Sequence, residues 1–185
     1  MSDRTSTRQE LIAAAQQLVV DGGWKMVTTR RVAERAGVSP GLVHYHVGSI
    51  EGLRRTAACE GARNLLEGPF QEALEASNLR EGLLAFLLRL DLKPDYPGVV
   101  LLNEALVAAT HDAELRSDLA TMFSTFRARL AKRLAAQKGA HAGEAEARAL
   151  VLIAAVDGFL LQRALDPSLG AEQLVRGIEP FLEPQ

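Results

Sequence analysis

The stretch from Thr28 to Leu53 constrains the fold more than any other part of this chain. It reads TTRRVAERAGVSPGLVHYHVGSIEGL. A threonine at its start can cap a helix, and Gly37 can adopt the left-handed conformation that commonly ends one. Ser39 followed by Pro40 predicts a new helix start, because proline at the first helical position loses no hydrogen bond. The pattern therefore predicts two short helices joined by a tight turn, with a third helix directly after them.

Two short helices around a glycine turn form the helix-turn-helix pattern, in which the second helix enters the major groove of DNA. Val32, Ala33 and Ala36 share one face of the first helix at helical spacing. We expect Val43 and Val47 of the second helix to pack on that face. The other face of the second helix is then left for DNA.

The same segment resembles the DNA-binding domain of the TetR family of transcriptional regulators. The shared elements are VTTRRVAERAGVS, the HYHV end of the second helix, and the Ser49, Glu51 and Leu53 start of the next. Upstream, residues 8–23 look like that family's first helix. The likeness covers about the first third of the chain. The remainder is similar in length, in helical character and in the late stretch ALVLIAAVDGFLLQRALDP.

The resemblance implies an all-α protein with two parts. Residues 1–48 are expected to form a three-helix helix-turn-helix DNA-binding domain, and residues 49–185 a helical ligand-binding and dimerisation domain. The implied function is that of a homodimeric transcriptional regulator, by family default a repressor. A small, largely apolar effector would release it from a pseudo-palindromic operator in double-stranded DNA.

The expected DNA contacts lie in and around the two short helices. Arg30 stands where the family reaches into the major groove, and its guanidinium can hold guanine O6 and N7 together or contact only phosphate. Thr28 and Thr29 resemble the family's phosphate-anchoring threonines, with helix capping as the alternative. The other predicted contacts are Ser39, Pro40, Gly41, Leu42, His44, Tyr45 and His46.

Two positions depart from the family pattern. Leu42 stands where the family usually has threonine, and Ile50 where it usually has lysine. A missing lysine removes a phosphate contact, whereas Leu42 could still pack on a thymine methyl group. The operator sequence therefore cannot be inherited from a relative. Ile50 and the modest basic charge of the N-terminal part also leave open a helical ligand-binding or scaffold dimer that has lost DNA binding.

Composition is consistent with a cytoplasmic regulator. Hydrophobic residues make up 48% of the chain, enough for a core, and the single cysteine, Cys59, excludes an intrachain disulfide. The longest apolar run, residues 149–156, is too short to cross a bilayer, so no membrane partner is expected. Residues 1–56 have eight basic and five acidic residues, a balance of +3, while the remainder has a balance of −5. The basic N-terminal part, here called the head, suits contact with phosphate.

Beyond residue 48 the pattern predicts only helices. The first begins near Ser49 and is expected to break at Gly68-Pro69, with a short amphipathic helix after the break. The later helices are predicted at Leu79–Leu92, Pro97–Thr110, Asp112–Lys138, Glu144–Leu165 and Leu169–Leu182.

The last two long helices are apolar on more than one face. This favours a two-fold dimer in which they pair into a four-helix bundle, with full burial inside one subunit as the alternative. The predicted interface residues are Phe126, Leu130, Leu150, Ala154, Asp157, Gly158 and Leu161.

An apolar cavity is expected between the helix from Ser49 and the helices Leu79–Leu92, Pro97–Thr110 and Asp112–Lys138. These segments carry more apolar residues than one buried face needs. Such a lining suits a mostly hydrophobic molecule held by one or two polar contacts, although the same residues could close into a solid core. The predicted ligand-binding residues are Phe86, Arg89, Asn103, Met122 and Phe126.

Catalytic motifs are missing from the sequence. It contains no nucleophile elbow, phosphate-binding loop, dinucleotide fingerprint or histidine–glutamate metal motif. His44 and His46 are two residues apart, and such residues do not share a helix face, so joint metal ligation is unfavourable. We therefore expect no enzyme activity, no cofactor and no metal site.

Overall fold

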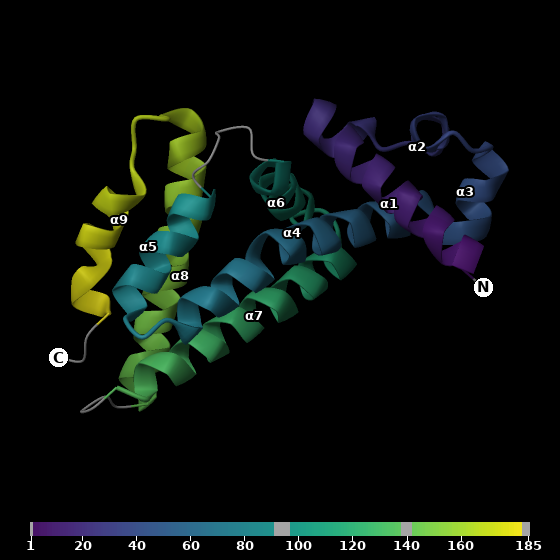
Figure 1. The fold of residues 1–185 in the computed structure, drawn as a ribbon. Coiled ribbons are helices and arrows are strands. Elements are labelled where there is room, and N and C mark those ends of the chain that lie inside the picture. The colour runs from purple at the N-terminus through teal and green to yellow at the C-terminus, as the bar shows by residue number, and fades with distance from the viewer. Residues whose placement is uncertain (1, 91–96, 138–141, 183–185) are drawn as a thin grey trace. The chain divides into compact units, whose positions relative to one another are not determined.

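The computed structural model describes residues 2–90, 97–137 and 142–182, and every regular element in these ranges is a helix (Figure 1). The all-α prediction is confirmed. None of the described helices is both long enough and apolar enough to span a membrane. The helices are α1 (Ser2–Gly22), η1 (Trp24–Met26), α2 (Thr29–Ala36), α3 (Pro40–Val47), α4 (Ile50–Glu75), α5 (Leu79–Leu90), α6 (Pro97–Ala108), α7 (Ala113–Ala135), α8 (Ala142–Leu165), α9 (Ala171–Ile178) and η2 (Glu179–Phe181).

The chain folds into two compact units. Within the described residues, the first unit comprises 2–64 and 97–119, and the second comprises 65–90, 120–137 and 142–182. Helices α4 and α7 each contribute residues to both units. Helix α6 belongs to the same unit as the helix-turn-helix. The sequence predicts that the DNA-binding domain ends at residue 48. That functional boundary stays a prediction.

The helix-turn-helix forms where the sequence predicts it. The Thr28 hydroxyl caps α2 by accepting from the Arg31 N–H at 3.4 Å. Gly37 ends α2 with a φ of 68°, in the left-handed region. The position of Ser39 before α3 is also as predicted, but its side chain makes no capping hydrogen bond. Its backbone carbonyl instead accepts the Leu42 N–H at 3.0 Å, which satisfies that donor without the hydroxyl.

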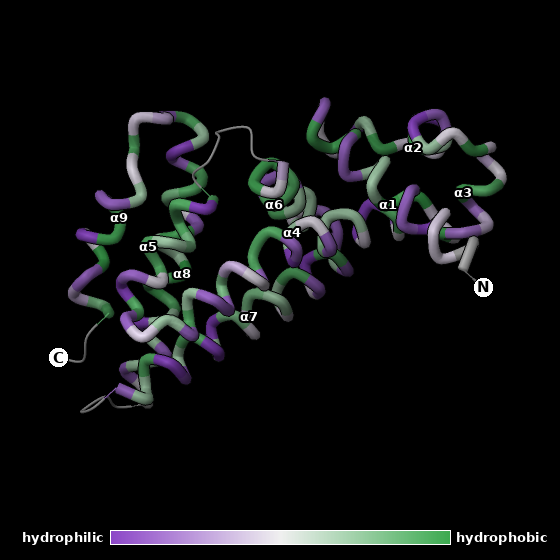
Figure 2. Tube along the Cα trace, in the orientation of Figure 1, coloured by the Kyte–Doolittle hydropathy of each residue, from purple (hydrophilic) through white to green (hydrophobic). Residues whose placement is uncertain are grey.

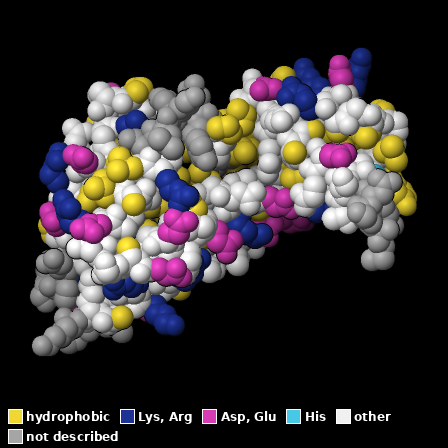
Figure 3. Space-filling view, viewed as in Figure 1, with side chains coloured by type: hydrophobic (Ala, Val, Ile, Leu, Met, Phe, Trp, Pro, Cys, Tyr) yellow, Lys and Arg dark blue, Asp and Glu magenta, His cyan; other side chains and the backbone are white. Residues whose placement is uncertain are grey.

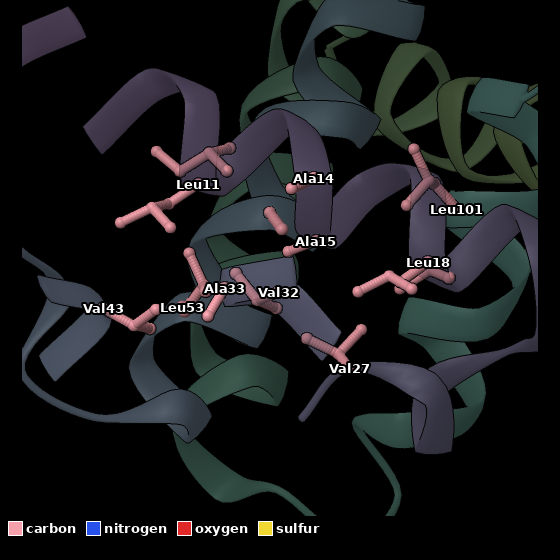
Figure 4. Close-up of a cluster of buried hydrophobic side chains, with 13 residues drawn as sticks. Leu11, Ala14, Ala15, Leu18, Val27, Val32, Ala33, Val43, Leu53 and Leu101 are labelled. Carbon is pink, nitrogen blue, oxygen red and sulfur yellow. The ribbon is translucent and has the colours of Figure 1, made fainter. Parts of the chain in front are cut away.

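A buried apolar cluster holds the first unit together (Figure 4). Val43 of α3 is only 1% exposed and Val47 packs partly buried against the same cluster, as the sequence predicts. Helix α6 contributes Leu101 to this core. The Figure 4 labels mark the members Leu11, Ala14, Ala15, Leu18, Val27, Val32, Ala33, Val43, Leu53 and Leu101.

Three side chains tie the segment before α2 and the end of α1 to other helices of this unit. Glu104 of α6 accepts the backbone N–H of Trp24 at 2.8 Å, supplying an acceptor at the first residue of η1. The Arg54 guanidinium of α4 donates twice to the carbonyl of Val27, at 2.9 and 2.5 Å. Gln16 of α1 donates to a carbonyl of α4 at 3.0 Å. The backbone leading into the helix-turn-helix is therefore anchored by both α4 and α6.

Helix α4 does not break at Gly68-Pro69, so that prediction is wrong. The helix runs to Glu75 with Pro69 inside it. A proline inside a helix costs about 3 kcal/mol or more. The helix buries four large apolar side chains around Pro69, and each contributes about 1.5–3 kcal/mol. Their burial outweighs the proline. They are Leu65, Leu66, Phe70 and Leu74.

The second unit is closed by arginines that bind backbone carbonyls. Arg133 of α7 donates to the carbonyls of Leu74 and Ala76, at 3.1 and 3.3 Å, and so caps the C-terminal end of α4. Buried Arg148 of α8 donates to the carbonyl of Phe181 at 2.8 Å and holds η2 in place. The last helix was predicted at Leu169–Leu182 and is shorter than that. Helix α9 ends at Ile178, and the 3-10 helix η2 follows it directly at Glu179.

Hydropathy along the trace agrees with this packing. Figure 2 shows α6 as mostly hydrophobic, and Val99, Leu101, Leu102 and Ala105 of that helix are buried. On the face drawn in Figure 3, acidic and basic side chains are interspersed over the second unit. That face therefore presents mixed charge and not a single-sign field.

The left-handed turn after α2 gives a direct test of the motif. We expect Gly37→Ala to lower the free energy of unfolding by about 1–2 kcal/mol, because a Cβ disfavours this backbone conformation. No atom lies within 4 Å of the added carbon, so the loss would come from backbone strain alone. Thermal and urea unfolding would measure it. The matched control is Gly41→Ala in α3, which should be neutral or stabilising by up to about 1 kcal/mol. Equal effects of the two variants would contradict the prediction.

Candidate nucleic-acid interface and internal cavity

Arg30 has the geometry expected of a DNA contact. It lies in the first turn of α2, is exposed, and forms no ion pair with any residue that the structure describes. Arg35, one helical turn further on, is already paired with Asp21 at 2.7 Å. Arg55 is likewise held by Glu114 at 2.7 Å. Arg30 therefore keeps its guanidinium donors for an external acceptor.

The outer face of α3 is exposed next to Arg30. Leu42 and Tyr45 are 42% and 62% exposed, whereas Val43 on the opposite side is buried. His44 places its Nδ1 atom 3.2 Å from the carbonyl of Gly48, which leaves Nε2 as the ring nitrogen free of that contact. The rings of Tyr45 and His46 meet edge to face with centroids 5.1 Å apart. An exposed hydrophobe, a phenol and imidazoles can contact base edges or phosphates.

The two threonines and the N-terminal residues of α3 complete the predicted surface. Thr28 and the residues Ser39, Pro40 and Gly41 are exposed, while Thr29 is half-buried. The Thr28 hydroxyl accepts a long capping bond and keeps its own hydrogen for a phosphate. The structure thus presents these residues, Arg30 and the outer face of α3 within a single helix-turn-helix.

The second unit contains a small, partly open cavity of about 30 Å³, large enough for a water molecule. Helices α4, α5, α7, α8 and α9 line it, and α6 does not. The cavity expected beside α6 stays a prediction. Of the predicted ligand residues, only Phe86 and Phe126 lie in its wall. Exposed Arg89 instead pairs with Glu72, and neither Asn103 nor Met122 is in the lining. The wall consists of Leu66, Phe70, Leu83, Phe86, Phe123, Phe126, Leu130, Leu152, Ile153, Val156, Asp157 and Ile178.

The phenylalanines in the cavity wall form a connected aromatic cluster. Phe70 meets Phe126 and Phe86 edge to face, with ring centroids 5.1 and 5.9 Å apart, and Phe123 lies 6.5 Å from Phe126. The Arg129 guanidinium lies 5.7 Å from the Phe70 ring centroid and 5.9 Å from that of Phe126. The rings of Phe70 and Phe126 therefore already lie near one positively charged group.

Among the residues that the structure describes, Asp157 is the one ionisable residue in the cavity wall. No residue that the structure describes forms a hydrogen bond or an ion pair with its carboxylate. Burial raises the pKa of Asp157 to about 6, and the positive charge of Arg127 opposes that rise. At neutral pH a largely apolar site therefore holds an ionised carboxylate without a close partner.

The predicted interface residues fall into two groups. Phe126 and Leu130 are buried within the subunit, so the structure assigns them to its core and not to a surface. Leu150 and Leu161 are each 56% exposed, and Ala154 is exposed between them. The α8 stripe, defined as Leu150, Ala154, Asp157, Leu161 and Leu165, has the spacing of one helix face. Asp157 lies on this stripe and also lines the cavity, while Gly158 beside it is half-buried.

The pH dependence of stability should reveal the cost of the Asp157 charge. Because its pKa is raised in the fold, Asp157 stabilises the protein below the unfolded value of about 3.9, and this contribution is lost as pH rises through about 6. We expect Asp157→Asn to raise the free energy of unfolding at pH 8 by roughly 1–3 kcal/mol, with little change at pH 4. Urea unfolding across this range would measure it. Exposed Asp118→Asn is the control, and a pH-independent difference for Asp157→Asn would contradict the assignment.

Sequence comparisons identify both parts of the chain. Residues 11–57 match the family of bacterial regulatory proteins, tetR family. Residues 74–183 match the tetracyclin repressor-like C-terminal domain. The chain is 33% identical over 63 residues to the HTH-type transcriptional repressor AcnR of Corynebacterium glutamicum, and the match spans 34% of each protein. The match thus spans about a third of that repressor's length.

Solved structures share the fold over nearly the whole chain. A transcriptional regulator from Rhodococcus sp. Rha1 superposes with a TM-score of 0.79 at 25% identity, over 95% of this chain and 93% of that one. A transcriptional regulator from Saccharomonospora viridis, solved in complex with choline, has a TM-score of 0.76 over 96% of each chain. At 16% identity, the second shows the fold alone. The chain is therefore a member of the TetR family of transcriptional regulators, which are not enzymes.

Proposed function

We propose that this protein is a homodimeric repressor that binds a pseudo-palindromic operator and is released by a small effector. The observation that carries the DNA-binding part is that Arg30 is exposed, without an ion pair to any described residue, in the same helix-turn-helix as the exposed outer face of α3. A guanidinium in this position can pair with a guanine edge, while the threonines and the first residues of α3 position the head on phosphates. Acting on DNA would place the protein in the cytoplasm.

Dimerisation follows from the area that one head can cover. A single small DNA-binding module buries about 600–1,000 Å² of protein surface, which is little for tight specific binding. The α8 stripe, with Leu150, Leu161 and Leu165 exposed, gives the chain an apolar face suited to a second copy. Arg127 and Lys132 of α7 border the groove beside Leu150. Two copies joined through α7 and α8 would present two recognition helices to one operator.

Effector release requires a link between the cavity and the head, and α4 provides one. Phe70 in the cavity wall and Arg54, which holds the carbonyl before α2, belong to this helix. An effector that enlarges the cavity would shift α4 and the spacing of the two heads. A coupling of about 1–3 kcal/mol would change operator affinity roughly 5–150-fold.

The operator interaction can be tested at Arg30. We expect Arg30→Ala to weaken binding to an operator selected from genomic fragments by about 1–3 kcal/mol if the guanidinium contacts a base. A phosphate contact would instead lower the affinity for all sequences about equally. Quantitative gel shifts at several salt concentrations would separate the two. Arg176→Ala is the matched control, because Arg176 lies on the exposed side of α9. If the unmodified protein shows no salt-dependent binding to duplex DNA, the scaffold-dimer alternative is favoured. That alternative is supported by Ile50, which is part-buried and stands where the family usually has lysine.

The dimer can be tested on the α8 stripe. We expect Ala154→Glu to produce monomers that lose the operator, because a buried, unpaired charge costs about 3–5 kcal/mol. Sedimentation velocity at micromolar concentration, together with gel shifts, would measure both effects. Ala85→Glu on the exposed side of α5 should remain a DNA-binding dimer. A monomeric unmodified protein that still binds a pseudo-palindrome tightly would overturn this part of the proposal.

A further inference from the structure

The cavity of the second unit combines four aromatic rings with a single carboxylate. We propose that it binds a small organic cation, whose charge pairs with Asp157 and whose apolar substituents contact the phenylalanine rings. This assignment rests on the proposed effector-responsive function and adds the chemical class of the effector. The carboxylate, the rings and the size of the cavity each support it.

The Asp157 carboxylate selects for positive charge. It is half-buried among apolar wall residues and has no hydrogen-bond or ion-pair partner among the residues that the structure describes. An anion in the cavity would be repelled, and a neutral apolar molecule would desolvate the carboxylate further without compensation. A cation instead supplies the missing partner. The same holds if dimerisation covers the α8 stripe, because the charge would then be buried more deeply.

The aromatic cluster suits the same ligand. The face of a phenylalanine ring attracts a cation electrostatically, and the attraction grows when water is excluded. The Phe70 and Phe126 rings already lie 5.7 and 5.9 Å from the Arg129 guanidinium, which is outside the cavity wall. Phe86 and Phe123 add two further rings to the wall. An ammonium group with short alkyl substituents would therefore meet aromatic rings as well as the carboxylate.

The size of the cavity limits the ligand and ties binding to a conformational change. A volume of about 30 Å³ holds water but not an alkylammonium ion. Binding therefore selects a state in which wall side chains have moved apart. Only a ligand with different affinities for the two states can shift the equilibrium between them.

The charges around Asp157 make the proposal testable by pH. Arg127 of α7 favours its ionised form, and burial opposes it, so the pKa of Asp157 is raised to about 6. Wall residues from α4, α5 and α9 are all uncharged. Protonation of Asp157 would remove the partner of the cation. Cation affinity should accordingly fall as pH is lowered through about 6.

The test compares three probes with the same branched carbon skeleton: isobutylammonium, isobutanol and isobutyrate. Isothermal titration of the full-length protein at pH 7.5 should show the ammonium binding at least about tenfold more tightly than the alcohol, with isobutyrate weakest. In Asp157→Asn, which is expected to fold at least as stably, the ratio of ammonium to alcohol affinity should fall to about one. Glu172→Gln, on the exposed side of α9 and outside the cavity wall, should keep the original ratio. Lowering the pH to 5.5 should weaken ammonium binding in the unmodified protein but not in Asp157→Asn.

Equal or tighter binding of the alcohol, selectivity that survives in Asp157→Asn, or no ammonium binding would each overturn the inference. So would an Asp157→Asn protein that loses its dimer and keeps its selectivity, since Asp157 would then serve the interface. The effect on DNA is a separate readout. Asp157-dependent ammonium binding that leaves operator affinity unchanged would uphold the cation site and refute the proposed effector release.

Discussion

Helix α4 has to satisfy two hydrophobic cores with one continuous backbone. Its first turns bury Leu53 and Ala57 in the core of the first unit, and its last turns bury Phe70 and Leu74 in the second. The gain from the second core is large enough to keep the helix intact across Pro69. Because the helix remains unbroken, residues of the cavity wall and the anchor of the helix-turn-helix belong to one continuous helix. The proposed communication between effector and DNA depends on that continuity.

The sequence predicted the head well because its signals are local. The Thr28 cap and the left-handed Gly37 act within a few residues, and the structure places both as expected. The body depends on tertiary packing, which local rules do not capture. The same local rules ended α4 before Phe70, so that ring was not assigned to the cavity. Likewise no local rule predicts that Glu104 of α6 accepts a hydrogen bond from the backbone N–H of Trp24 in η1, because the two residues are 80 positions apart in the sequence.

Asp157 shows why a helix pattern alone cannot assign a residue's role. Its spacing from Leu150 and Leu161 places it on an exposed stripe, which predicted an interface role. The structure adds that Asp157 also lines the cavity, together with Leu152, Ile153 and Val156 of the neighbouring face of α8. An ionised carboxylate there lowers stability at neutral pH, and an asparagine would avoid that cost. A residue that costs stability in an apolar cavity is better explained by ligand recognition than by folding.

The small volume of the cavity bears on how an effector could act. If the enlarged state makes up about 1% of the molecules, the apparent affinity of a cation falls about a hundredfold below its affinity for that state. The same closure has a benefit for regulation. A cation that cannot enter the closed state has the greatest possible difference in affinity between the two states, and this difference limits how far a ligand can shift an equilibrium. Tight packing of the phenylalanines around Asp157 would therefore weaken effector binding. It would also mean that a bound effector shifts the equilibrium more completely to the enlarged state, in which α4 has moved.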